Sequence, residues 1–370
     1  MLKRFGFILA AVLMLIAGSA MATNTRVLTM GENNNILMDE ANIEIWPQTL
    51  LMYGGRGLIE ITDSTITNCA GFLKFGDVTM GGAFSNGGLV PRYAPMGAFG
   101  MGARGLDQKI TLFFARNLSG MPFGLGLSLY GESDIRDAPG DQRSETGLGL
   151  KLNAGITVME TIEAFASLGM VNWELKNSAG NVTADVDGGV TISLGGRWWR
   201  EMSERYTLIP HAMLMIDSQG DKTGGRNMNA MIIDLGIGNN IRLGDNVLMV
   251  HDLGTMIDIG SLESGGASKD TLLWYLPYFK MGFEAPVSKH FVFRCGGLKE
   301  WVIVGEDANG ASHAKSYVNT RFYIGAGYTR DRFVFDANVD PGFFTRGPYL
   351  LTGAGNSMAM SVSLRYIWGD

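Results

Sequence analysis

The last segment of the chain alternates apolar and polar residues along its whole length. Residues 357–368 place an apolar or aromatic side chain at every even position, ending in Tyr366 and Trp368, while serines and Arg365 lie at odd positions. Because successive side chains of a β-strand point to opposite faces, this strand has one wholly apolar face and one face rich in small and polar groups. Such a two-faced strand is typical of the wall of a transmembrane β-barrel and indicates an outer-membrane location.

The same alternation recurs along the chain in segments of about ten residues or more. In 147–158, even-numbered aliphatic residues oppose Lys151, Asn153 and Thr157. A soluble sandwich also alternates, but an apolar parity that runs the full length of long strands suits a lipid-facing band better. We therefore expect residues 145–368 to form antiparallel strands closed into an all-β barrel, since lipid offers no water to an open sheet edge. Six side chains expected to face outward are Leu150, Ile156, Leu194, Leu214, Phe322 and Val362.

The predicted connections alternate in length. Short turns are expected at 76–77, 118–119, 159–160, 202–203, 244–245, 287–288 and 330–331. Longer polar or glycine-rich loops are expected at 87–107, 132–143, 177–183, 218–226, 259–269, 304–314 and 343–355. Short periplasmic turns and longer outer loops are the outer-membrane pattern, which puts both chain ends on the periplasmic side and requires an even strand count. The count is 14 if 57–76 lies only partly in the wall, and 16 if it supplies a full hairpin.

The first 22 residues read as a secretory signal peptide. Lys3 and Arg4 precede an uncharged apolar stretch, and Ala20-Met21-Ala22 is a cleavage site of the small-x-small type. No stretch of 18 or more apolar residues follows, so no membrane-spanning helix is expected. We expect an exported protein in the cell outer membrane of a Gram-negative-type bacterium, with outer-membrane lipid and the barrel-assembly machinery as its partners.

Composition narrows the class further. Glycine is abundant, at 52 residues, and proline is scarce, at 10. Abundant glycine is typical of barrel walls, where strands bend and side chains crowd one another. The formal charge of −6 becomes −8 once Lys3 and Arg4 are removed, which argues against nucleic acid as a partner. Two cysteines, Cys69 and Cys295, do not by themselves define a disulfide, and we expect them to be unpaired.

Charged side chains lie on the polar parity, which should face the lumen. They are Lys151, Glu163, Arg197, Arg205, Asp217, Asp234, Asp252, Arg294, Arg321, Asp336 and Arg365. Both signs are present, so many should pair across neighbouring strands and keep the barrel rigid; the functional alternative is a charged constriction that selects solutes. We expect Arg294, Arg321, Asp336 and Arg365 to point inward and at least one to pair with an acid, because unpaired charges in a tight interior are costly.

No arrangement of residues indicates an enzyme, a cofactor or a metal. The four histidines show no metal-ligand spacing. His251 and Asp252 are adjacent, so within one strand they point to opposite faces and cannot form a dyad. The glycine-rich stretch 97–102 is not followed by the Lys-Ser/Thr of a phosphate loop.

Residues 25–50 break the strand pattern and carry the one resemblance to a family. Their features are Arg26, Met30-Gly31, Asp39, Ala41-Asn42 and Pro47. The segment resembles the start of mature barrels in the long-chain fatty-acid transporter (FadL-like) superfamily, although Trp46-Pro47-Gln48 stands where that family usually has Asn-Pro-Ala. The resemblance implies a 14-strand barrel whose N-terminal segment plugs the lumen. We thus expect a plug segment at 23–56 and a barrel at 57–370, with Asp39 and Asn42 hydrogen-bonded to the wall.

Several functions fit these features. A FadL-like protein would pass hydrophobic small molecules passively through a plugged barrel. A general porin, a structural or adhesive outer-membrane anchor, or the barrel subunit of a secretion system are the alternatives. The first requires a closed lumen with an apolar site, whereas a porin requires an open aqueous channel.

Overall fold

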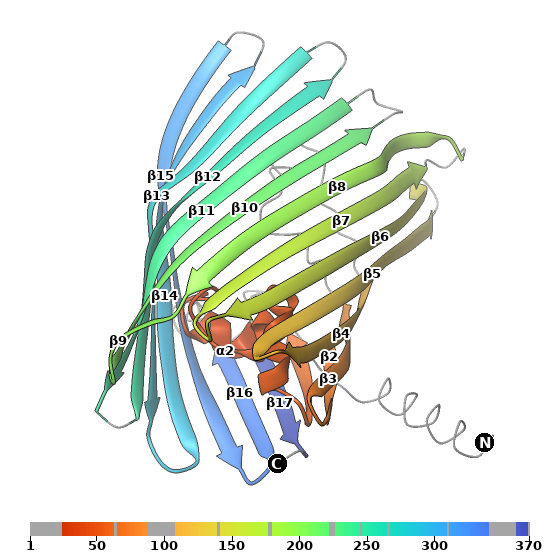
Figure 1. The fold of residues 1–370 in the computed structure, drawn as a ribbon. Coiled ribbons are helices and arrows are strands. Elements are labelled where there is room, and N and C mark those ends of the chain that lie inside the picture. Colours follow the sequence, from red (N-terminus) through yellow and green to blue (C-terminus); the bar gives the residue numbers. More distant parts are fainter. Residues whose placement is uncertain are drawn as a thin grey trace, which may run out of the picture.

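The computed structural model is an antiparallel β-barrel with a short helical segment inside one end (Figure 1). It describes residues 24–62, 65–86, 108–138, 141–176, 180–221, 226–244, 246–264, 267–308, 311–339 and 360–368. The predicted signal peptide and the expected loops 87–107 and 343–355 lie outside the described residues. No helix in the described ranges is long and apolar enough to cross a bilayer.

Three short helices precede the strands: α2 (Asn24–Thr29) and the 3-10 helices η1 (Glu40–Glu44) and η2 (Pro47–Met52). The strands are β1 (Arg56–Thr62), β2 (Thr65–Phe75), β3 (Val78–Asn86), β4 (Gln108–Leu118), β5 (Met121–Ala138), β6 (Asp141–Val158), β7 (Ile162–Lys176), β8 (Val182–Trp198), β9 (Arg200–Ser203), β10 (Tyr206–Asp221), β11 (Arg226–Leu243), β12 (Val247–Ser264), β13 (Ala267–Pro286), β14 (Phe291–Ala308), β15 (Ala311–Arg330), β16 (Phe333–Val339) and β17 (Met360–Ile367).

The sheet closes on itself through its first and last strands. β1 pairs with β17 on one side and with β2 on the other, so neither end of the sheet is left as an edge. β8 and β9 both pair with β10 and are interrupted only at Trp199, so they form one wall strand. The 17 elements therefore make 16 wall strands. This is the larger of the two expected counts, and the reason is the one foreseen: 57–76 supplies a full hairpin, β1 and β2.

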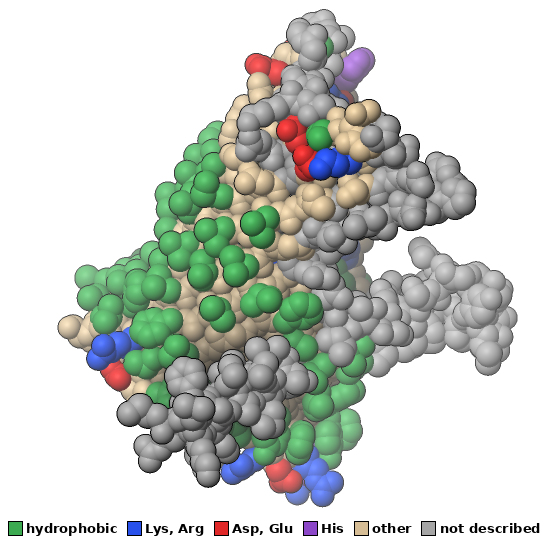
Figure 2. Space-filling model, turned by 90° about the vertical axis from the view of Figure 1, so that its right-hand side faces the viewer, with side chains coloured by type: hydrophobic (Ala, Val, Ile, Leu, Met, Phe, Trp, Pro, Cys, Tyr) green, Lys and Arg blue, Asp and Glu red, His purple; other side chains and the backbone are tan. Residues whose placement is uncertain are grey.

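The outer surface carries the expected apolar band. Leu150, Leu194 and Phe322 face outward and are 43%, 48% and 52% exposed, while Ile156, Leu214 and Val362 lie half-buried between outward neighbours. Figure 2 shows hydrophobic side chains covering the side of the barrel, with the charged side chains of this face near its two ends. Apolar groups on this scale stay in contact with solvent only when that solvent is lipid, so the fold is a transmembrane β-barrel.

Arginine at position 194 should destabilise the barrel according to its depth in the membrane. Leu194 lies on the outer face four residues from Trp198, about 13 Å along the strand. Leu194→Arg should lower the free energy of unfolding in lipid vesicles by roughly 2–4 kcal/mol, as expected near the midplane. Leu243→Arg, at the end of β11 on the same face, is the matched control and should cost about 0–1 kcal/mol. Equal costs at both depths would contradict the lipid-facing assignment.

Several expected loops are strand instead. β5 and β6 pair as far as Ala138 and Asp141, within the expected loop 132–143. The same holds for most of 218–226, 259–269 and 304–314, whereas 177–183 does separate β7 from β8. The strands β5–β15, β9 apart, are 15 to 20 residues long, and a transmembrane strand needs only about 9–11. The ladders therefore continue through polar residues beyond the lipid, where apolar alternation is no longer required.

The short turns fall at one end of the barrel, which we call the short-turn end. Six of the seven lie where expected, while the turn expected at 202–203 follows β9 at 204–205. At the β4–β5 turn Ser119 and Gly120 both have positive φ, 53° and 88°, the conformation of a tight hairpin turn. Cys69 and Cys295 are free thiols, as expected.

Candidate functional site

Residues 24–53, here called the inner segment, lie inside the barrel near the short-turn end (Figure 1). Much of their apolar surface is buried against the wall. Met30, Ile36, Ile43 and Leu50 are completely buried, and Trp46 is 2% exposed. The segment is therefore packed into the lumen as a folded element.

Local sequence explains the shape of the inner segment. Asp39 accepts a hydrogen bond from the backbone N–H of Ala41 and caps η1, and Pro47 opens η2, where its missing N–H costs nothing. Wall glycines then let the segment approach closely. A Cβ atom at Gly124 would strike the backbone of Pro47, and one at Gly296 would strike the backbone of Gly31. Part of the glycine abundance thus reflects this contact with the wall.

Two apolar clusters join the segment to the wall. In the first, Ile43, Leu50 and Tyr53 pack on inward-facing Phe72 and Phe113. In the second, Val27, Met30, Ile36 and Leu37 pack on Ile209 and Val250. Because this apolar surface is buried, the hydrophobic effect holds the inner segment against the wall.

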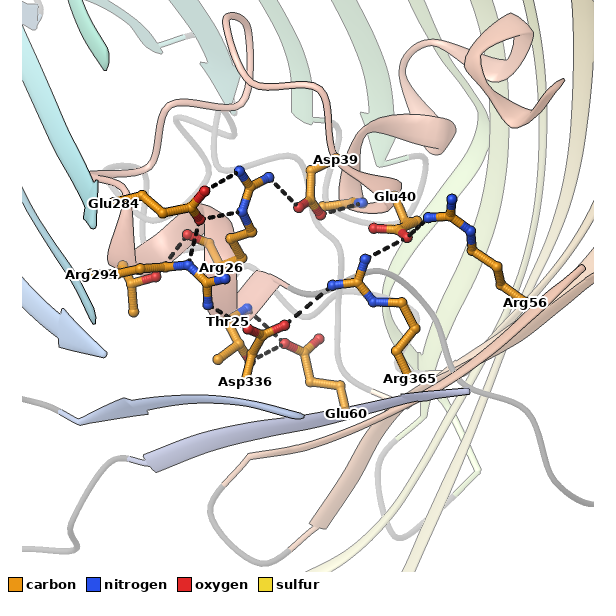
Figure 3. Close-up of polar contacts among 12 residues, drawn as sticks. Thr25, Arg26, Asp39, Glu40, Arg56, Glu60, Glu284, Arg294, Asp336 and Arg365 are labelled. Carbon is orange, nitrogen blue, oxygen red and sulfur yellow. Dashed lines mark hydrogen bonds and ion pairs between the residues drawn. The ribbon is translucent and has the colours of Figure 1, made fainter. Parts of the chain in front are cut away.

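A chain of alternating charges links the inner segment to β13, β14, β16 and β17, and we call it the ion-pair ring (Figure 3). It comprises Asp39, Arg26, Glu284, Arg294, Asp336, Arg365 and Glu40. The Arg26 guanidinium bridges Asp39 at 3.1 Å and Glu284 at 2.8 Å. Arg365 bridges Glu40 at 2.8 Å and Asp336 at 3.3 Å. Since Asp39 and Glu40 are neighbours in the chain, the ring closes on the inner segment.

The charges around Glu40 favour the ionised form of its carboxyl group. Burial alone would raise the pKa of Glu40, but Arg365 and Arg56 outweigh it and hold that pKa below its ordinary value. Burial and the adjacent Glu40 carboxylate raise the pKa of Asp39, against the attraction of Arg26. Glu60 of β1 also holds the inner segment, because it accepts hydrogen bonds from the backbone N–H and the hydroxyl of Thr25 (Figure 3).

A second attachment involves a cation held between two aromatic rings. Arg197 of β8 lies over the ring of Trp46 at 4.3 Å and over that of Trp199 at 4.8 Å. Its Nε donates to Glu163 of β7, and its Nη1 donates to the carbonyl of Asn35 in the segment at 2.8 Å. Both members of this ion pair are almost fully buried. The arginine thus ties two wall strands to the inner segment.

Two further ion pairs fasten the segment elsewhere. Glu44 pairs with Lys109, and Lys151 lies within electrostatic range of that pair. Glu32 accepts from Arg321 at 3.0 Å and from the Tyr323 hydroxyl. Inner-segment acids therefore meet wall bases on both sides of the barrel.

The predicted lumen residues, one apart, do face inward. Arg294, Arg321, Asp336 and Arg365 all form ion pairs, as expected. Only some of the pairing is between neighbouring strands, as in Glu163 with Arg197; much of it is with the inner segment. Arg205 is the exception: it lies exposed in the turn between β9 and β10, because the strand parity stops at Ser203.

Other residues differ from expectation in their partners. Asp39 bonds to Arg26 and Ala41, and Asn42 donates to the carbonyl of Leu37, so the hydrogen bonds shown for both lie within the segment. Other charged groups of the segment, such as Arg26, Glu40 and Glu44, form ion pairs with the wall. Asp252 pairs with His211, two strands away, at 2.9 Å, an arrangement that adjacency with His251 could not indicate.

The inner wall changes character toward the end opposite the short turns. There the inward-facing side chains of β10–β14 are mainly apolar. This apolar band consists of Met213, Met215, Met228, Ala230, Ile232, Met256, Leu273, Tyr275, Val302 and Val304. Ladder partners share a face of the sheet, so each of these residues faces the lumen with its neighbours. The lumen thus has a charged level at the inner segment and an apolar level beyond it.

The chain resembles solved barrels over most of its length. A Pseudomonas aeruginosa FadL homologue is 11% identical, with a TM-score of 0.45, over 95% of this chain and all of that one (100%). The Pseudomonas putida toluene transporter TodX is 11% identical, with a TM-score of 0.41, over 94% and 96% of the two chains. The FrpB iron transporter of Neisseria meningitidis reaches the same TM-score of 0.41 at 10% identity, over 79% and 62%.

FadL-like proteins are thus among the structures that the chain resembles. No family model and no curated protein matches the sequence.

Proposed function

We propose that this protein is a plugged barrel of the Gram-negative-type outer membrane that lets hydrophobic small molecules pass passively. The observation that carries the proposal is the apolar band on the lumen side of β10–β14. A channel for ions and polar solutes needs a polar lining, whereas apolar lumen walls favour apolar solutes. The inner segment supports the same proposal. A barrel of this size is wide enough to hold an aqueous channel, as porins do, and here the inner segment lies in that space.

The alternative functions are favoured less by the same features. A general porin would not need a segment held by buried ion pairs across its lumen. A purely structural anchor would not need inward-facing apolar residues beyond that segment, since polar or packed positions would serve. A secretion-system subunit has no specific feature in its favour among the described residues.

The proposal predicts uptake of an uncharged apolar probe. Cells that make the full-length protein in an outer membrane containing lipopolysaccharide should take up radiolabelled decanol faster than cells that lack it. Val302→Asn should lower this rate by roughly tenfold, since its ladder partners Tyr275 and Tyr317 offer no carboxylate to the new amide and burying an amide without a partner costs about 1–3 kcal/mol. Thr191→Asn is the matched control on the inner face of β8, where the new amide still reaches Asp217, and it should leave uptake unchanged.

Bilayer recordings complete the test. The full-length protein should conduct ions only weakly while it transports decanol. A protein that conducts like an open porin and leaves decanol uptake unchanged would overturn the proposal in favour of a general porin. If the protein shows no ion conductance and no decanol uptake, the proposal is overturned in favour of a structural anchor.

A further inference from the structure

Three carboxylates lie within or beside the apolar band: Asp217, Asp234 and Asp258. Asp258 of β12 faces the lumen between its ladder partners Ile232 of β11 and Leu273 of β13. It lies six residues from Asp252, which pairs with His211 at the level of the inner segment, so the two acids are about 20 Å apart along the strand. Asp258 therefore belongs to the apolar level of the lumen.

Asp258 is buried without a partner in the described part of the chain. Its exposed fraction is 6%, and no described group donates a hydrogen bond to its Oδ1 atom. The nearby lumen acids differ: Asp217 accepts from Thr191 and Gln219, and Asp234 accepts from the Tyr278 hydroxyl. Because a buried carboxylate without a donor is costly, such a group in a native protein calls for an explanation.

The lumen has room beside this carboxylate. Met256, Leu273 and Tyr275, which surround it on β12 and β13, are only half-buried although they face inward. Their accessible surface is lumen surface, because the other face of these strands meets lipid. A ligand lying along these three side chains would be in contact with apolar groups and within reach of Asp258.

On β10–β12 the inward-facing charged residues near Asp258 are all acidic, whereas on β13 the inward-facing Lys269 pairs with Glu306 and on β15 Lys315 faces inward opposite Val304. The inward-facing residues in 213–219, 228–234 and 256–262 include Asp217, Asp234 and Asp258 and no lysine or arginine. Beside β10–β12 the local potential therefore attracts cations and repels carboxylates. A fatty acid would bring its own negative charge into this field.

We propose that Asp258 is the polar anchor of a binding site for cationic amphiphiles, that is, apolar molecules that carry one protonated amine. The ammonium group would donate a charge-assisted hydrogen bond to the carboxylate, and the apolar part would lie on Met256, Leu273 and Tyr275. This inference rests on the proposed function, because it names the class of hydrophobic solute that the lumen prefers.

Three ligands of equal chain length test the site: decylamine, decanol and decanoate. Binding to the full-length protein in detergent is measured by isothermal titration calorimetry. Decylamine should bind roughly 10- to 100-fold more tightly than decanoate, the range expected for one hydrogen bond to a charged group. This selectivity is measured on the unaltered protein, so the test does not depend on how any variant folds.

Asp258→Asn then assigns the selectivity to one residue. The substitution keeps the shape of the side chain and should lower decylamine affinity by roughly tenfold or more while decanol affinity changes less than about twofold. Asp77→Asn, an exposed acid in the β2–β3 turn, is the charge-matched control and should change neither.

The outcomes separate this inference from the function on which it rests. Equal affinities for all three ligands, or selectivity that survives Asp258→Asn, would overturn the cationic site while decanol binding still supports hydrophobic transport. Failure of all three ligands to bind would overturn both.

Discussion

Deletion of residues 24–53 should turn a nearly silent barrel into one with porin-like ion conductance. The inner segment fills the short-turn end of the lumen, and barrels of about 16–18 strands without a plug hold an aqueous channel. Once the segment is gone, ring residues such as Arg294, Asp336 and Arg365 would face water, which solvates them. The measurement is single-channel conductance of the refolded barrel in a planar bilayer.

A variant that keeps the segment but loosens it gives the intermediate case. Arg26→Ala combined with Arg365→Ala removes the bridge from the segment to Glu284 and one of the two wall bridges to Glu40, leaving the bridge from Arg56. We expect brief openings in this variant and steady conductance in the deletion. Loss of the folded barrel's gel mobility would identify misfolding, and a folded deletion variant that remains silent would show that residues 24–53 do not close the lumen.

Removal of Arg197 should have the largest effect of any single substitution on stability. The Arg197→Met variant leaves Glu163, whose side chain is 4% exposed, without its guanidinium, and it also removes the contacts with Trp46 and Trp199. Breaking a buried ion pair from one side costs about 3–5 kcal/mol. Urea unfolding of the protein in lipid vesicles, followed by tryptophan fluorescence, measures the change.

Two controls separate the buried charge from lost packing. The double variant Glu163→Leu/Arg197→Met removes both charges and should recover much of the lost stability, since apolar replacement of a buried pair is often neutral. Arg116→Met breaks the exposed pair with Asp77 and should leave stability nearly unchanged. If Arg197→Met were as mild as Arg116→Met, the proposed attachment would be wrong.

Much of the wall could be predicted because the information is local. In the segment 147–158, each outward residue is two positions from the next, and lipid requires all of them to be apolar. The count of 16 depended on one hairpin, 57–76, in which short strands carry a weaker pattern. Loop lengths were overestimated because strands such as β5 and β6 stay paired after the apolar alternation has ended.

The site was less predictable because its contacts are remote in sequence. Glu40 meets Arg365, 325 positions away, and Glu32 meets Arg321, 289 positions away. The resemblance of residues 25–50 indicated a plug, yet it did not indicate which charges hold it. Wall glycines such as Gly124 and Gly296 were a usable signal, because the close approach of another chain segment is one reason for glycine in a strand.

The sequence by itself determined that this chain forms strands with an apolar outer face, because a period of two and the demands of lipid act on each strand separately. Only the tertiary structure decided what lies inside. Closure of the barrel and the register of its ladders select which inward residues become neighbours, and they gather the methionines and aliphatic residues of β10–β14 into one band around Asp258. Alternation gives the face on which a side chain lies, whereas its partners across the lumen depend on the closed barrel and the folded inner segment.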